Sequence, residues 1–489
     1  MTQPIYDVVI VGAGLSGLQA ACTVHQAGLS YVVLEARDRV GGRTLTARSS
    51  TGTAKAELGA AWINDTNQSR MWALAEELGL HTFVQNTDGD VVVQDFDGSL
   101  VKFPYGEAPK YPSDQDTESC ISIRDLVENL STTQSPSIFS PGPHRDSLDS
   151  ISFETFLQRA RVTDKALATA QVWTHAMLGV DPSEVSALYF IEYCAAGGGL
   201  MTMRSDSKGG GQYLRIREGT SSFAEGLLEK LNPRSIKLSS PVAEIHQQPD
   251  GTGTETGTVS ISVGGPAPAP PQTYLARRVI VSVPTPVYRT IKFSPALPAA
   301  KSAIVNRTRY GFYTKYIVNF SEAFWTKSRL CGLAQSFVGP VSVFRDTSLG
   351  PEQPAMTCFI GGSFGRKWAS QDAEAKKASV LKQMGEIFAG GEDISEFVVE
   401  AVESPWMEEE FSGWGCPCAN MPPGVLAQGW DALCAPFGHV FFVGTELSTV
   451  WRGYMEGAVR SGESGAWQAI ADLRGGRRQQ QQQQQTSKL

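Results

Sequence analysis

The sequence has few cysteines, no long apolar run and no excess of positive charge. Its eight cysteines are spread over 489 residues, which is too few and too scattered for a disulfide-stapled domain, so we expect a reducing compartment. No apolar stretch approaches the roughly 18 to 20 residues of a membrane-spanning helix, so no membrane span is expected. A net charge of −8 leaves no basic face for phosphate backbones and argues against nucleic acid as a partner. We therefore expect a small-molecule partner.

The two ends of the chain carry different signals. The first residues lack the basic and apolar regions of a secretory signal peptide, so no such leader is expected. The chain ends in Ser487-Lys488-Leu489, the address that a peroxisomal import receptor reads. Residues 479–489 begin with seven glutamines that have nothing to bury, and they are predicted to form a disordered tail. The expected localisation is a soluble protein of the peroxisome.

The first forty residues carry a dinucleotide-binding pattern. A short β-branched run over residues 6–11 is typical of a buried parallel strand, and it leads into Gly12-Ala-Gly14-Leu-Ser16-Gly17 and then helical spacing. In this turn Gly12 permits the tight bend, Gly14 lets the backbone approach a pyrophosphate, and Gly17 lets the helix pack on the strand. The helix N-terminus then offers its amide groups to the phosphates.

A second buried strand over residues 31–34 ends at Glu35. Glu35 lies 18 residues beyond Gly17, where a carboxylate can accept both hydroxyls of an adenosine ribose. An acid at this position disfavours a 2′-phosphate. The first 35 residues therefore predict dinucleotide binding, and the residues after them distinguish NAD from FAD.

Those residues resemble the flavin-containing monoamine oxidase family. The runs that match are Glu35-Ala36-Arg37-Asp-Arg-Val-Gly-Gly42-Arg43 and Glu57-Leu-Gly59-Ala60-Ala-Trp62. Further landmarks follow in the family's order, among them Gly210-Gly-Gln212, Pro241-Val242 and Gly444-Thr-Glu446. The resemblance spans residues 5 to 470 and points to a soluble fungal-type amine oxidase.

The resemblance implies a fold and a set of FAD contacts. The implied fold is α/β plus α+β, with a Rossmann-type FAD-binding domain (1–85, 208–292 and 404–478) interleaved with a mixed-sheet and helical substrate domain (86–207 and 293–403). Arg43 is implied to contact the pyrophosphate, and Val242 the adenine. The full cofactor-binding set is Gly12, Gly14, Ser16, Gly17, Glu35, Ala36, Arg37, Gly42, Arg43, Gly59, Ala60, Val242, Trp406, Cys416, Gly444, Glu446 and Met455. No metal site is expected, because the six histidines show no partnering spacing.

Lys315 is the leading catalytic candidate. It lies in an apolar run that predicts a buried strand, where an ammonium group needs a partner because its burial is costly. The resemblance implies that Lys315 holds a water beside the flavin and assists reoxidation by O2. The alternative is a lysine that reaches solvent from an edge strand.

Two cysteines flank a proline in the loop over residues 411–424. Cys416 lies six residues before Pro422-Pro-Gly424, the spacing at which monoamine oxidases join a cysteine to the flavin. The resemblance therefore implies a covalent 8α-S-cysteinyl FAD on Cys416. An extra residue around Trp414 keeps Cys418 as a second candidate, and a loop without a tether is a third interpretation. A metal or redox dithiol lacks the necessary further ligands or spacing.

The substrate site departs from the family pattern at one position. Tyr454 matches one of two aromatic rings that face the flavin, but the other ring should follow the tethering cysteine, where this chain has Pro417. Trp414 is the candidate to replace it. Gln212 is predicted to orient the substrate, with an ordinary turn residue as the alternative. Lys315, Tyr454, Gln212 and Trp414 form the predicted catalytic set.

These observations predict an FAD-dependent amine oxidase. A hydride passes from the α-carbon of an amine or alkaloid-like substrate to flavin N5, and O2 reoxidises the flavin, giving hydrogen peroxide and an imine or aldehyde. Two alternatives stay open: an oxidative cyclase or dehydrogenase of secondary metabolism with the same fold, and a non-catalytic flavin-binding scaffold. The identity of the amine and the choice between monomer and homodimer also stay open.

Overall fold

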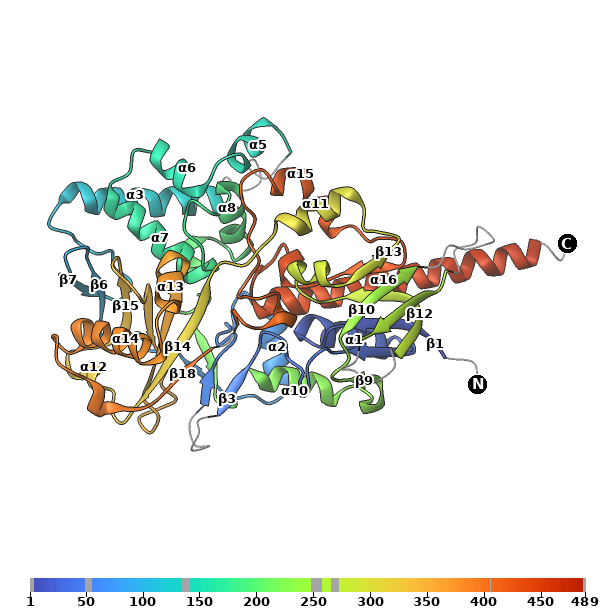
Figure 1. Ribbon diagram of the computed structural model, residues 1–489, viewed down its shortest axis with the longest axis horizontal. Coiled ribbons are helices and arrows are strands. Elements are labelled where there is room, and N and C mark those ends of the chain that lie inside the picture. The colour runs from blue at the N-terminus through green and yellow to red at the C-terminus, as the bar shows by residue number, and fades with distance from the viewer. Residues whose placement is uncertain are drawn as a thin grey trace.

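A computed structural model describes residues 4–48, 55–133, 141–247, 257–264, 272–404 and 406–486. Two parts built around separate sheets lie side by side, with the long helix α16 (Met455–Thr486) reaching beyond one of them (Figure 1). Ser487-Lys488-Leu489 lie outside the described residues, so the peroxisomal address stays a prediction. Among the helices of the described ranges, none has the length and apolar character needed to span a membrane.

The larger sheet contains the predicted dinucleotide-binding strands. Its order is β13-β10-β11-β12-β1-β2-β9, and β19 also pairs with β12. Parallel pairing joins β1 (Ile5–Val11), β2 (Tyr31–Leu34), β9 (Ile236–Lys237), β12 (Gln272–Val281) and β19 (Val440–Phe442). The other strands are β10 (Val242–Gln247), β11 (Val259–Val263) and β13 (Lys292–Ser294). All four residues of β2 are buried, as expected for an apolar strand covered on both faces.

The turn between β1 and α1 (Leu15–Gln26) has the predicted geometry. Gly12 has a φ of +99°, a conformation that glycine adopts without strain. A Cβ atom at Gly17 would clash with the Gly12 carbonyl oxygen, so only glycine lets the helix approach the strand this closely. α1 packs against α16 and α10 (Ser221–Glu229), and α16 also packs on α2 (Ser69–Glu77). The strand, turn and helix predicted from the sequence are confirmed.

The second sheet has the order β18-β14-β17-β16-β15-β6-β7. Its strands are β6 (Asp90–Gln94), β7 (Leu100–Pro104), β14 (Tyr313–Phe320), β15 (Leu330–Ser336), β16 (Val343–Asp346), β17 (Ala355–Gly361) and β18 (Val398–Glu403). β14 carries Lys315, and every residue of β14 is buried. Because β14 lies between β17 and β18, the alternative of a lysine on an edge strand is wrong.

Some of the helices pack against this second sheet, and those of residues 114–204 gather at one end of the molecule (Figure 1). They are α3 (Asp114–Ser131), α5 (Pro143–Asp149), α6 (Phe153–Arg159), α7 (Asp164–Leu178), α8 (Ala187–Ala196) and α9 (Leu200–Arg204). The later helices are α11 (Ala299–Arg307), α12 (Phe324–Lys327), α13 (Gly362–Ala369), α14 (Ala373–Phe388) and α15 (Leu426–Cys434). Two small pairs complete the strands, β3 (Thr46–Arg48) with β4 (Lys55–Glu57) and β5 (Thr82–Val84) with β8 (Leu214–Ile216).

Two features differ from the expected segment limits. The predicted limit between residues 292 and 293 falls inside β13, which pairs with β10 in the larger sheet. Helix α16 continues through Gln479–Gln485, where the sequence predicts a disordered tail. Glutamine is a good helix former, and a helix already nucleated by packed residues extends at little cost. The remaining segment assignments stay predictions.

Candidate active site

A single cavity of about 310 Å³ is lined by residues from both sheets. It contains the β1–α1 turn at one end and residues of β14, β16 and β17 at the other. All the predicted site residues lie on its wall except Gly17, Glu446 and Trp414. The structure therefore brings together residues that are more than 400 positions apart in the sequence, such as Gly12 and Tyr454.

The turn end of the cavity has unused hydrogen-bonding groups. The side-chain hydroxyl of Ser16 is buried and has no hydrogen-bond partner within the described ranges. The N-cap residue of α1 is Gly14, which has no side chain to cap the helix, so the first amide groups can bind an anion. Glu35 is buried, and its two carboxylate oxygens accept hydrogen bonds from the amides of Ala13 (2.6 Å) and Arg37 (2.9 Å). These groups fit the diphosphate and ribose of a dinucleotide.

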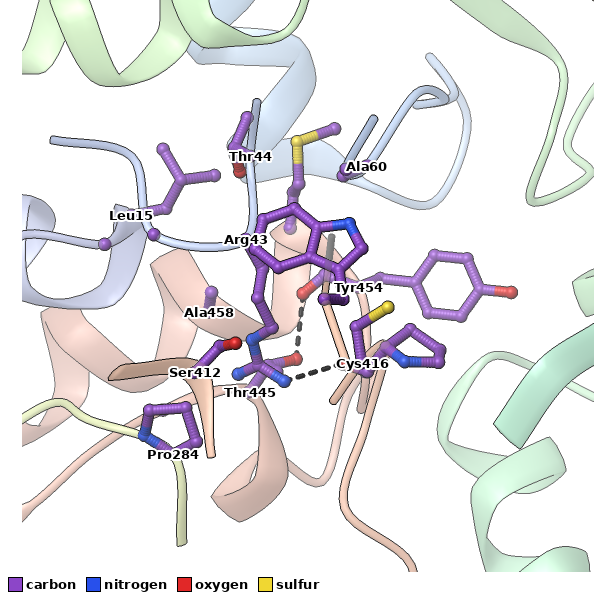
Figure 2. Close-up of a pocket in the computed structure, with 18 of the residues that line it drawn as sticks. Leu15, Arg43, Thr44, Ala60, Pro284, Ser412, Cys416, Thr445, Tyr454 and Ala458 are labelled. Atoms are coloured by element: carbon purple, nitrogen blue, oxygen red, sulfur yellow. Dashed lines mark hydrogen bonds between the residues drawn. The ribbon is translucent and has the colours of Figure 1, made fainter. Parts of the chain in front are cut away.

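Arg43 connects this end of the cavity to the cysteine loop. Its Nη1 donates to the carboxylate of Glu446 (2.6 Å), the hydroxyl of Tyr310 (2.9 Å) and the carbonyl of Pro417 (2.6 Å). Figure 2 shows the Arg43 side chain extending toward the loop that carries Cys416. Glu446 does not line the cavity, and its ion pair with Arg43 instead keeps the guanidinium in place.

Lys315 forms hydrogen bonds with the backbone of residues 57–59, a segment that contains the predicted site residue Gly59. Its Nζ donates to the carbonyls of Glu57 (3.1 Å) and Gly59, which explains how the ammonium is tolerated on a buried strand. Burial lowers the pKa of Lys315 to about 8, and the charge of Glu57 opposes this shift. An ammonium has three N–H donors, so one is left for a group in the cavity.

The two loop cysteines have different surroundings. Cys416 lines the cavity, whereas Cys418 does not. The sulfur of Cys418 instead contacts the hydroxyl of Tyr189 at 3.6 Å, and Cys418 is fully buried. Burial raises the pKa of the Cys416 thiol to about 12, while Lys315 and Arg43 act to lower it. Among the described residues, no group of three His, Cys, Asp or Glu side chains is arranged to hold a metal ion.

Tyr454 lies on the cavity wall near Cys416 (Figure 2). Trp414 does not line the cavity. The Trp414 side chain is 43% exposed, which contradicts the prediction that it enters the cavity as a second aromatic ring. Next to it, the backbone of Gly415 packs so closely on Tyr310 that a Cβ atom would clash there. The backbone of the loop therefore packs against Tyr310, and the Trp414 ring lies toward solvent.

Gln212 lies on the wall close to Tyr454. Its Nε2 donates to the carbonyl of Met203 at 2.9 Å, and the Tyr454 hydroxyl donates to the same carbonyl at 3.4 Å. The Oε1 atom of Gln212 is buried and accepts no hydrogen bond from the residues that the structure describes. Such an unused acceptor suits a ligand N–H, although the role of Gln212 stays a prediction.

Several residues of the cavity wall were not predicted from the sequence. Tyr313 and Phe359 lie on paired strands beside Lys315, and Arg204 and Arg345 add two positive charges. The alternation of strand residues could have found Tyr313, because positions two apart in a strand face the same side. The other three lie in segments with no recognisable motif, Phe359 and Arg345 on paired strands and Arg204 on helix α9.

The fold and site define a class of protein: a flavin-dependent oxidoreductase in which a dinucleotide-binding sheet is joined to a substrate-binding sheet with a buried lysine. The chain belongs to the flavin containing amine oxidoreductase family, whose model matches residues 15–470. It is an FAD-dependent amine oxidase, which confirms the predicted family, fold class and general activity.

Similar proteins cover almost the whole chain. The flavin-containing amine oxidase of Oncorhynchus mykiss is 32% identical over 476 residues, covering 96% of this chain and 87% of the relative. Amine oxidase B of Cavia porcellus is also 32% identical, over 95% of this chain and 86% of the relative. The structure of cyclohexylamine oxidase from Brevibacterium oxydans has a TM-score of 0.86 at 26% identity, covering 96% of this chain and all of that one.

Proposed function

We propose that this amine oxidase carries its FAD on Cys416 and uses Lys315 in the reaction with oxygen. The observation that carries the proposal is that Cys416 and Lys315 line one cavity and lie close enough for each charge to affect the pKa of the other. Arg43 lies near both residues. Its side chain donates to the carbonyl of Pro417, next to Cys416, and its carbonyl accepts from the amide of Ala60, next to the Gly59 carbonyl that Lys315 contacts. A tethering thiol and a cation are thus available at the same place.

The groups at the turn end suit the non-reacting half of FAD. Gly14 and Ser16 would hold the diphosphate through the N-terminus of α1, and Glu35 the ribose hydroxyls. Arg43 would add positive charge near the diphosphate, and Val242 and Trp406 would line the remaining wall. When bound, FAD takes a hydride equivalent from the α-carbon of an amine and passes the electrons to O2, giving hydrogen peroxide.

Cys416 is favoured over Cys418 by its access to the cavity. A thioether can form only where the sulfur reaches its target, and the sulfur of Cys418 is directed to Tyr189 instead. Lys315 and Arg43 both stabilise the thiolate of Cys416, which is the nucleophilic form. These positive groups partly offset the effect of burial, which favours the neutral thiol.

Lys315 is proposed to hold a water and to stabilise negative charge as oxygen is reduced. Two of its three donors are used by the carbonyls of Glu57 and Gly59, which fix the direction of the third. With a pKa of about 8, the amine is mostly protonated at neutral pH and can supply that charge. It can also release a proton at a modest cost.

The amine itself is proposed to bind uncharged against aromatic side chains. Tyr454, Tyr313 and Phe359 line the cavity and supply an apolar wall, with the unused acceptor of Gln212 nearby. Pro417 in place of a second facing ring motivates the alternative of an oxidative cyclase acting on a larger alkaloid-like amine. A non-catalytic scaffold would have no need for a buried lysine beside the cavity.

An amine panel with two readouts tests the proposal. Purified protein is mixed anaerobically with each amine while the flavin absorbance is followed, and peroxide is then measured in air. Reduction by amines and stoichiometric peroxide are expected. Reduction without release of an imine-derived aldehyde favours the cyclase, and no reduction by any amine contradicts the proposed function.

We also propose a peroxisomal location, because an import receptor would bind the C-terminal Ser487-Lys488-Leu489. Peroxide formation makes an organelle that removes peroxide a suitable compartment. A fluorescent fusion that keeps the natural C-terminus should colocalise with a peroxisomal marker, and removal of the last three residues should leave it in the cytosol. A diffuse signal from the intact fusion contradicts this location.

A further inference from the structure

We infer that the cavity accepts an amine that also carries a carboxylate, and that Arg204 holds this carboxylate. The inference rests on the proposed function, because it assigns a substrate class to the same site. Arg204 and Arg345 both line the cavity, away from the glycine turn. They differ in what they bind, and this difference indicates which of them is available to a ligand.

Arg345 is already neutralised by the protein. It forms an ion pair with Asp206, a carboxylate that is almost completely buried. The other oxygen of Asp206 accepts a hydrogen bond from the hydroxyl of Tyr105 at 3.2 Å. Both oxygens of Asp206 are therefore already engaged, one with Arg345 and the other with Tyr105.

Arg204 has no such partner. Within the described ranges its side chain forms no hydrogen bond or ion pair, and its guanidinium lies over the ring of Trp173 at 5.2 Å. Burial and the nearby charge of Arg345 lower the pKa of Arg204 to about 10, so it stays protonated at neutral pH. The charge of Asp206 also acts on Arg204, but Asp206 is ion-paired with Arg345. A guanidinium on the cavity wall with no ion pair of its own among the described residues can therefore accept a ligand carboxylate.

The shape and charge of Arg204 suit a carboxylate. A guanidinium binds a carboxylate through two parallel N–H donors, and the ring of Trp173 beside Arg204 limits where the guanidinium can lie. This makes the recognition directional as well as electrostatic. A neutral amide of the same length would lose most of the charge-assisted hydrogen bonding.

The positive end of the cavity is continuous with the predicted reaction site. The ring of Trp62 lies 5.9 Å from the guanidinium carbon of Arg345 and 5.4 Å from Nζ of Lys315. Arg204, Arg345 and Lys315 thus add three positive charges to the cavity wall, where Asp206 is paired with Arg345 and the charge of Glu57 acts on Lys315. A diamine would bring a second ammonium into this field and be repelled, whereas an aminocarboxylate would be attracted.

Ligand binding to the FAD-loaded enzyme tests the inference without turnover. Hexanoate and hexanamide are titrated separately, and binding is measured from the change in flavin absorbance. Hexanoate is expected to bind at least about tenfold more tightly than hexanamide, and Arg204→Gln should remove this preference while Arg204→Lys keeps part of it. Arg217→Gln is the matched control, because Arg217 is exposed over Phe83 and does not line the cavity.

Substrate preference gives a second readout on a matched six-carbon set. Norleucine or 6-aminohexanoate should reduce the flavin faster at low concentration than hexylamine, and hexane-1,6-diamine should be the slowest. Equal binding of hexanoate and hexanamide to the wild-type enzyme, or faster reduction by the diamine, overturns the inference. If no amine reduces the flavin but hexanoate still binds through Arg204, the proposed function fails and the carboxylate site stands.

Discussion

The carbonyl of Pro417 accepts a 2.6 Å hydrogen bond from Nη1 of Arg43. This bond connects the residue after Cys416 to the last residue of the run from Glu35 to Arg43. The same Nη1 atom is also paired with the carboxylate of Glu446 at 2.6 Å. Through Arg43, the cysteine loop and the dinucleotide-binding sheet form one unit. The position of Cys416 is thus set by contacts over more than 370 residues of sequence.

Arg43→Gln should destabilise the protein by about 3 to 5 kcal/mol, because it leaves the carboxylate of Glu446 buried without a counter-charge. The double variant Arg43→Gln with Glu446→Gln should recover part of this loss, since the pair is removed together. Thermal unfolding of the four proteins of this cycle measures the coupling. Strictly additive effects of the two substitutions would contradict the assigned pair.

Lys315→Met should slow flavin reoxidation by at least about tenfold, equivalent to about 1.4 kcal/mol on the barrier, while anaerobic reduction by the amine persists. The substitution keeps the apolar part of the side chain and removes its charge. Stopped-flow absorbance separates the two half-reactions. Lys301→Met is a matched control, because Lys301 is another buried lysine that does not line the cavity. Equal reoxidation rates for wild type and Lys315→Met exclude the proposed role.

The depressed pKa of Lys315 predicts a pH-dependent stability. Its pKa is about 8 in the folded protein against an ordinary value of 10.5, so between these values the unfolded chain binds more protons. The contribution of Lys315 to the free energy of unfolding therefore rises with pH between about 8 and 10.5. This contribution is lost as the pH falls through about 8. Compared with Lys315→Met, wild type should gain on the order of 2 kcal/mol between pH 7.5 and pH 10. Denaturant unfolding of wild type and Lys315→Met at both pH values measures this change. If the difference in their free energies of unfolding is the same at both pH values, the lowered pKa of Lys315 is wrong.

The outward position of Trp414 separates it from Tyr454 in function. Trp414→Ala should change kcat and KM for an amine by less than about twofold, since the ring is 43% exposed and lies outside the cavity. Tyr454→Ala should raise KM by at least about tenfold, because it removes an aromatic wall of the amine site. Steady-state kinetics on both variants decides this. A large loss with Trp414→Ala would mean that the loop moves inward during turnover.

Local patterns predicted the fold around the β1–α1 turn. Gly12 and Gly17 lie in one strand–turn–helix unit, and Glu35 directly follows the next strand. Their spacing in the sequence is therefore enough to define their geometry. Trp414 was misjudged because the direction of a loop side chain depends on packing against Tyr310, more than 100 residues away. Arg204 and Arg345 were missed for the same reason, since only the folded sheet and helices bring them to one cavity wall.

The location of the flavin on Cys416 is tested most directly by denaturing and precipitating the protein and measuring flavin absorbance in pellet and supernatant. The flavin of wild type and of Cys418→Ala is expected to stay in the pellet, whereas the flavin of Cys416→Ala is expected to move to the supernatant. Mass spectrometry of the peptide containing residue 416 should then show the added mass of FAD. Wild-type flavin that washes out freely, or flavin retained by Cys416→Ala, would contradict the tether.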